Sequence, residues 1–199
     1  MPDLQKVDLK SAALLTLDCQ KGIVGFVPGS EKIFPLASKV VKASRLAHIP
    51  VIHIGIGFRG GYPEVHPRHP MFGMIRQTGR FILGSDSAAF HESVAPEKDE
   101  IIIVKHRVSA FSGNDLEMIL RSQEITTLIL FGLSTSGIVL STIRQASDMD
   151  FQCVIVKDCC FDQDEEVHRV LTEKVFSRQA RVVTADMIIK EMESLGQKN

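Results

Sequence analysis

The sequence of 199 residues lacks the features that mark several large classes of protein. No uninterrupted apolar run approaches the ~18–20 residues that a membrane-spanning helix needs. Lys and Arg number 23 and Asp and Glu 24, so the chain has neither the basic excess typical of nucleic-acid binding nor an acidic tail. Residues Met1–Lys10 are polar and charged and lack the apolar core of a secretory signal peptide. We therefore expect a cytoplasmic protein with no nucleic-acid or membrane partner.

Cysteine is scarce as well, with only Cys19, Cys153, Cys159 and Cys160. Their spacing does not suggest a disulfide framework, and a bridge between the adjacent Cys159 and Cys160 would be strained. They are typical of the reduced thiols of a cytosolic protein. The sequence also lacks a C-x-x-C motif and a phosphate-binding G-x-x-x-x-G-K-S/T motif, which argues against a redox or nucleotide-binding protein. We expect no cofactor.

Short apolar segments alternate along the chain with segments of helical periodicity. The expected strands are Ala12–Leu17, Pro50–Ile56, Ile101–Val104, Thr126–Leu133, Gln152–Val156 and Arg181–Val183. The expected helices are Glu31–His48, Leu116–Arg121, Ser136–Met149, Glu165–Phe176 and Ala185–Ser194. Strands without polar alternation, separated by helices, indicate βαβ units and a parallel sheet. We expect a three-layer α/β/α, Rossmann-like fold in a single domain over residues 1–199.

One long segment, Gly57–Asp99, interrupts this alternation with about 43 residues of little periodicity. A segment of this length is usually functional or carries small elements of its own. Its glycines and prolines suit a folded excursion over an active-site face. Arg59 within it is a candidate for holding a negatively charged substrate at the mouth of a site, because a guanidinium binds carboxylates well.

Three features converge on one edge of the predicted sheet. Open parallel sheets bind ligands outside the carboxyl ends of their strands. Asp18 ends the first strand, Lys105 follows the third, and Gly132–Ile138 leaves the fourth strand and enters a helix. Free N–H groups at a helix start can hold a carboxylate or a developing oxyanion. Since a carboxylate and an ammonium in one crevice shift each other's pKa, Asp18 and Lys105 are candidate catalytic residues.

Four segments in this order resemble the motifs of the isochorismatase-like hydrolase family, also called the cysteine hydrolases. Leu15–Gln20 resembles the first-strand motif, in which an Asp is followed two residues later by Gln. Pro96–Phe111 resembles the block that carries the lysine, Gly132–Thr142 resembles the third block, and Asp158–His168 continues the match. The resemblance spans roughly residues 12–190. It implies a six-stranded parallel sheet and assembly as a homodimer or homotetramer.

Amidase-type members of the family use an Asp, a Lys and a nucleophilic Cys. The resemblance carries the first two to Asp18 and Lys105, and an ungapped count from Gly132 places the third at Ile138. Because isoleucine has no nucleophilic atom, covalent thioester catalysis at that position is excluded.

Isochorismatases, which cleave a vinyl ether, offer a route without a thiol. Proton delivery to the enol-ether carbon gives an oxocarbenium-like centre that water captures, and a sheltered carboxylic acid suffices as the acid. On this interpretation Asp18 is the acid/base, and Lys105 tunes it or anchors a substrate carboxylate. We expect a hydrolase that acts on a small, carboxylated metabolite.

The other candidate site residues surround this pair. The N–H groups of Gly137 and Ile138 are expected to bind an anionic or carbonyl oxygen. Ser134 belongs to the same group, and the resemblance implies a cis peptide between Leu133 and Ser134. Phe111 either walls the site or packs beneath it.

Several alternatives stay open. A nucleophile relocated to Cys159 or Cys160 is conceivable, although small buried cysteines are common in cores. The pair His66-x-x-His69 has workable metal spacing, but polar loop histidines are usually just exposed, and we expect no metal. Gln20 is expected to brace the backbone near Asp18. Loss of the nucleophile also fits a degenerate family member that binds a small molecule or a protein without turnover.

Overall fold

Six parallel strands form the centre of the protein, whose computed structural model describes residues 7–196. They are β1 (Ala12–Leu17), β2 (Val51–Ile56), β3 (Ile101–Lys105), β4 (Thr127–Gly132), β5 (Gln152–Val156) and β6 (Ala180–Val183). Their order across the sheet is β3-β2-β1-β4-β5-β6, and every pairing is parallel. The expected six-stranded parallel sheet is confirmed.

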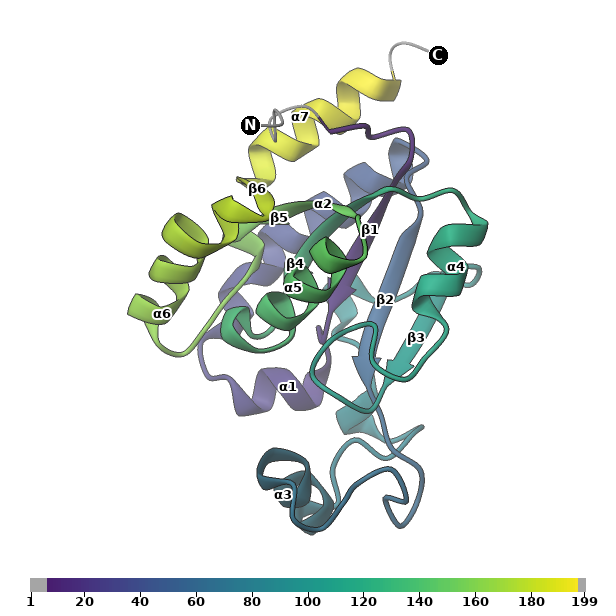
Figure 1. Ribbon diagram of the computed structural model, residues 1–199, viewed down its shortest axis with the longest axis vertical. Coiled ribbons are helices and arrows are strands. Elements are labelled where there is room, and N and C mark those ends of the chain that lie inside the picture. Colours follow the sequence, from purple (N-terminus) through teal and green to yellow (C-terminus); the bar gives the residue numbers. More distant parts are fainter. Residues whose placement is uncertain (1–6, 197–199) are drawn as a thin grey trace.

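Helices cover both faces of this sheet (Figure 1). One face carries α2 (Phe34–Leu46) and α7 (Ala185–Gly196), which contact each other, and the opposite face carries α4 (Leu116–Ser122), α5 (Leu140–Asp148) and α6 (Glu165–Val170). The chain runs from β1 out to β3 and then returns through β4 to β6. Right-handed crossovers in opposite directions place their helices on opposite faces, which explains the three layers. Among residues 7–196, no helix is both long and apolar enough to cross a membrane.

Burial explains why the strands carry no polar alternation. Every residue of β1, β2 and β4 is buried, because helices cover the central strands of a parallel sheet on both faces. Strand β3 lies at the edge of the sheet, and its Ile102 is 51% exposed. The apolar runs therefore identified the strands correctly, including one that is covered only in part.

Two helices differ from the sequence prediction at their starts. The α-helix expected over Glu31–His48 begins at Phe34, since Pro35 fits only the first turn of a helix. The helix expected over Ser136–Met149 begins with a π-type turn at Thr135–Val139, where Gly137 adopts the non-helical angles φ −93° and ψ −107°. Irregular turns of this kind often occur at functional sites.

The long segment between β2 and β3 folds at the carboxyl ends of the strands, at the bottom of Figure 1. It contains α3 (Pro70–Thr78) and most of a second apolar cluster, separate from the main core, formed by Ile56, Phe58, Tyr62, Val65, Phe72 and Phe81. Gln20, which precedes α1 (Lys21–Phe26), ties this segment to the sheet. Its amide nitrogen donates to the carbonyls of Ala88 at 2.7 Å and Ile56 at 2.9 Å, so the predicted bracing role of Gln20 is confirmed.

The backbone of Gly132, at the end of β4, lies very close to the backbone of Leu17 on β1, beside the candidate site. Its φ of 150° lies in a region that disfavours side chains, and a Cβ at this position would collide with the carbonyl oxygen of Leu17 on β1. The neighbouring strand could move away only by breaking the parallel pairing of Leu17 with Gly132. Glycine at this position therefore sets the spacing of β1 and β4 beside Asp18.

Replacing Gly132 by Ala should lower the free energy of unfolding by at least about 2 kcal/mol, because backbone atoms cannot yield to the added methyl group. Chemical denaturation monitored by circular dichroism measures the change. Gly25→Ala is the matched control: Gly25 lies in α1 with no atom within 4 Å of its would-be Cβ, and this variant should be neutral or slightly stabilising. Equal stability of the two variants would contradict the proposed close approach.

Candidate active site

A buried ion pair lies at the carboxyl edge of the sheet. Asp18 directly follows β1 and adopts a left-handed backbone conformation with φ 51°, and Lys105 is the last residue of β3. The Lys105 ammonium nitrogen lies 2.9 Å from Oδ2 of Asp18, and the two side chains are only 2% and 8% exposed. The structure thus brings together the two residues that the sequence marked as candidates, across the intervening strand β2.

The two oxygens of the Asp18 carboxyl group differ in their surroundings. Oδ2 accepts the contact from Lys105, whereas Oδ1 is buried and has no hydrogen-bond partner among the described residues. Burial raises the pKa of Asp18 above its usual range, and the charge of Lys105 opposes part of this rise. A carboxyl group with a raised pKa and one unengaged oxygen is suited to give or take a proton.

Lys105 has donor capacity beyond the ion pair. Its ammonium group carries three N–H donors. One contacts Asp18, and another donates to the carbonyl oxygen of Arg107 at 3.0 Å. The third N–H is therefore a candidate donor to an oxygen of a bound molecule.

The turn after β4 forms the opposite side of the site. The peptide bond between Leu133 and Ser134 is cis, as the resemblance implies. The N–H of Gly137 donates to the Ser134 carbonyl oxygen at 3.2 Å, so it is already engaged. Of the two N–H groups proposed to bind a substrate oxygen, only that of Ile138 is retained in the candidate site.

A cavity of about 150 Å³ joins these groups. Its polar lining consists of Asp18, Lys105, Ser134 and the backbone at Gly137. The remaining lining is apolar and comes from Ile23, Val27, Ile56, Met71, Phe72, Ile75, Val108, Leu133 and Ile138. Five of the seven predicted site residues thus lie around one cavity, and Ile138 stands where the resemblance places the nucleophile.

Two predicted site residues, Phe111 and Arg59, do not line this cavity. Phe111 is buried in the main core and stacks on Phe151 with ring centroids 5.9 Å apart, so it packs beneath the site. The guanidinium of Arg59 is paired with Glu64 at 2.6 Å, and its side chain is 67% exposed. Both side chains contact partners that the sequence pattern does not show, and neither residue is retained in the candidate site.

Helix α3 contributes Met71, Phe72 and Ile75 to the lining of the cavity, and the sequence did not predict that this helix lies at the site. Asp18 and Lys105 could be predicted because each stands at the end of an apolar strand. The segment that contains α3 has little apolar periodicity, so the sequence does not show which way its side chains point. The apolar spacing of Phe72 and Ile75 was the available signal, since residues three apart share a helix face.

The four cysteines are buried and do not line the cavity. All four are buried, and burial raises the pKa of every one of these thiols, to about 12 for Cys153 and Cys160. None of them belongs to the described residues that line the cavity. A protonated, buried thiol is a poor nucleophile, so the structure does not support a nucleophile relocated to Cys159 or Cys160.

The candidate metal ligands are engaged in local contacts. His69 accepts the N–H of Phe72 and caps α3, and His66 accepts the N–H of Arg68. Within the part of the chain that the structure describes, no group of three or more potential ligands comes together.

One glycine pattern that sequence reasoning overlooked is Gly55-Ile-Gly57-Phe-Arg-Gly60, which has the spacing of a dinucleotide-binding fingerprint. That motif requires a helix to begin at the pattern, whereas the next helix begins only at Pro70. A Cβ at Gly55 would meet the amide of Gln20, and one at Gly57 would meet Leu83. These glycines serve close packing of the excursion against the sheet.

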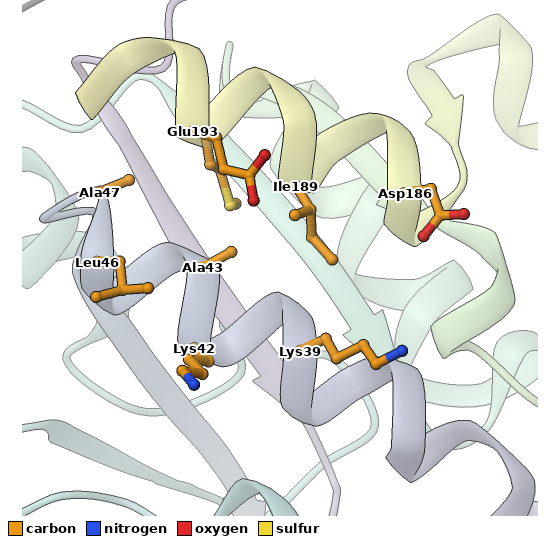
Figure 2. A pocket seen from close by; sticks show the side chains of 9 residues that line it. Lys39, Lys42, Ala43, Leu46, Ala47, Asp186, Ile189 and Glu193 are labelled. Carbon is orange, nitrogen blue, oxygen red and sulfur yellow. The ribbon is translucent and has the colours of Figure 1, made fainter. Parts of the chain in front are cut away.

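A wider groove of about 550 Å³ lies between α2 and α7 (Figure 2). Its charged side chains are Lys39 and Lys42 on α2 and Asp186 and Glu193 on α7, and all four are exposed. Exposed charges keep water around them and are not arranged for chemistry. The buried pair at the smaller cavity therefore remains the candidate active site.

Comparison with known proteins gives one consistent family. The isochorismatase domain matches residues 12–187. The isochorismatase family protein YecD of Escherichia coli is 28% identical over 190 residues, covering 94% of this chain and 99% of that protein. The maleamate amidohydrolase of Pseudomonas putida is 26% identical over 196 residues, covering 94% and 89%.

A solved structure agrees in fold. The crystal structure of a cysteine hydrolase from Pseudomonas syringae superimposes with a TM-score of 0.87 at 21% identity, covering 95% of each chain. At this level of identity the comparison concerns the fold alone.

Breaking the ion pair should destabilise the protein in a pH-dependent manner. In Lys105→Met the buried Asp18 loses its counter-charge, and its pKa rises further above the unfolded value. Between these two pKa values the folded state holds a proton that the unfolded state releases, so the free energy of unfolding falls as pH rises. We expect a loss of roughly 3–5 kcal/mol at pH 8 and a smaller loss at pH 4, measured by urea denaturation. Adding Asp18→Asn should abolish the pH dependence, and an equal loss at both pH values would contradict a charged pair.

The thiols provide a second test of the cavity. The four native cysteines should resist iodoacetamide in the folded protein, because burial raises their pKa. A thiol introduced by Ile138→Cys lies in the cavity with Lys105 and should be alkylated at least about tenfold faster. Ile143→Cys is the control, since Ile143 is fully buried in the core. Mass spectrometry measures the rates, and similar rates for both variants would exclude an accessible, electropositive cavity at Ile138.

Proposed function

The chain belongs to the isochorismatase family, and on this premise we propose that it is a hydrolase in which Asp18 transfers a proton and water, rather than a cysteine thiol, attacks the substrate. The observation that carries the proposal is the buried Asp18–Lys105 pair in a cavity whose described lining contains no thiol. The relatives with assigned activities include an amidohydrolase, which supports hydrolysis as the reaction class.

Hydrolysis of an enol ether is the reaction that these groups suit best. Burial raises the pKa of Asp18, so its carboxyl group takes up a proton more readily than an exposed aspartate, and in the protonated form it donates this proton to the enol-ether carbon. Water then adds to the resulting oxocarbenium centre and returns a proton to the Asp18 carboxylate. The hemiketal collapses to a carbonyl compound and an alcohol, so the net reaction consumes a water molecule and restores the acid. The third N–H of Lys105 and the N–H of Ile138 hold substrate oxygens during these steps.

The size and charge of the cavity limit the substrate. A volume of about 150 Å³ admits a small molecule only. Lys105 is the only cation among the described residues of the lining, and its charge becomes available to a substrate when Asp18 is protonated. We propose a substrate with no more than one carboxylate, bound to Lys105.

A binding role without turnover is the second candidate. Ile138 at the motif position of the nucleophile favours it, because this residue cannot take part in covalent catalysis. A screen of vinyl ethers, amides and esters separates the two candidates, since ligand binding without hydrolysis of any of them would support the binding role.

The family resemblance also underlies two further proposals. We propose that the protein is a homodimer or homotetramer, which sedimentation analysis measures directly. We also propose a cytoplasmic location, consistent with four thiols that are not paired in the structure.

Asp18→Asn should lower kcat at least about a hundredfold, because an amide cannot donate or accept the proton. Asn fills the same volume but leaves the Lys105 ammonium without its counter-charge, so circular dichroism should verify that the variant is folded under the assay conditions. Asp86→Asn serves as the control, because Asp86 is an exposed carboxylate paired with Lys21 outside the cavity. Steady-state kinetics on the best substrate of the screen checks both variants, and full activity of Asp18→Asn would reject the assignment.

A further inference from the structure

Helix α3 places an apolar wall opposite the buried ion pair. Met71, Phe72 and Ile75 line the same cavity as Asp18 and Lys105. Phe72 also belongs to the small apolar cluster of the excursion, where its ring lies 6.1 Å from that of Phe58. This packing holds α3 in place, so its apolar face is a built part of the cavity.

Most of the cavity is apolar, and its polar lining is limited to Asp18, Lys105, Ser134 and the backbone at Gly137. Nine of the thirteen described residues that line it carry apolar side chains. The charged groups, Asp18 and Lys105, form a single pair at one place. Apolar protein cavities of roughly 150 Å³ hold a molecule the size of benzene.

Lys105 is the only cation among the described residues that line the cavity, and two cations close to it in the structure, Arg107 and Arg59, are engaged by other groups. The guanidinium of Arg107 donates to the carbonyl oxygens of His106 at 2.6 Å and Glu64 at 3.0 Å and lies 5.6 Å from the ring centroid of Phe72. Arg59 is paired with the Glu64 carboxylate. A second carboxylate on a ligand would therefore lie against the apolar side chains of α3, with no cation besides Lys105 among the described residues of the lining, which is unfavourable.

We propose that the cavity selects small ligands with one polar head, held by Asp18 and Lys105, and an apolar remainder packed against α3, and that Met71 is a specificity-determining residue. The inference rests on the proposed function only in placing the reacting group at the ion pair. It concerns binding, and it excludes dicarboxylates as good ligands.

Two methionines of α3 form a matched pair for testing this proposal. Met71 lines the cavity and is 51% exposed, whereas Met74 is 57% exposed and is not among the lining residues. Because both side chains are about half exposed on the same helix, a lysine at either position should be tolerated by the fold.

The experiment compares pentanoate, pentanamide and glutarate, which share a chain length and differ in their terminal groups. Carbon-13 methyl NMR of the Met and Ile methyl groups reports both the affinity and the location of binding. In the wild type we expect pentanoate or pentanamide to bind at least about tenfold more tightly than glutarate, with shifts at Met71, Ile75 and Ile138. Met71→Lys should reverse the order by favouring glutarate, and Met74→Lys should leave it unchanged.

The outcomes separate this proposal from the proposed function. Glutarate binding to the wild type as tightly as both apolar-tailed ligands, or absence of binding by both of these, would overturn the proposal. A preference that responds equally to Met71→Lys and Met74→Lys would do the same. Because no turnover is measured, the selectivity can hold when Asp18 proves dispensable for hydrolysis, and it can fail while the hydrolase assignment stands.

Discussion

The buried ion pair of Asp18 and Lys105 is the interaction on which the rest of the site depends. Removing a carboxylate and an ammonium from water costs several kcal/mol for each ion, and only their close contact offsets this cost. The pair joins the ends of β1 and β3 across β2, so it marks one point on the carboxyl edge of the sheet. Lys105 holds the Asp18 carboxyl group in position through Oδ2, whereas Oδ1 has no hydrogen-bond partner among the described residues.

The surrounding structure buries this pair. Gly132 allows β4 to approach Leu17, the residue before Asp18, and the turn that follows closes one side of the cavity. The excursion between β2 and β3 closes another side, held by its own apolar cluster and by Gln20. This burial also raises the pKa of Asp18. The proposed acid/base function is compatible with the family fold, because fold and chemistry are set by different residues.

Residues whose position follows from chain order were predictable. Asp18 and Lys105 end apolar strands, and parallel strands present their carboxyl ends at one edge. The places of the Phe111 and Arg59 side chains were not predictable, because they depend on contacts with Phe151 and Glu64 that the sequence pattern does not show. The contribution of α3 was also hidden, since the segment that carries it has little periodicity.

The sequence by itself determined the class of fold, the order of its strands along the chain, and the identity of the candidate residues Asp18, Lys105 and Ile138. These features follow from local apolar patterns and from motif residues at definite positions. Only the tertiary structure decided that the two charged groups meet at 2.9 Å, that one carboxyl oxygen stays unengaged, and that an apolar helix faces them. The physical reason is that burial and side-chain partners arise from packing between distant segments, which no local pattern records.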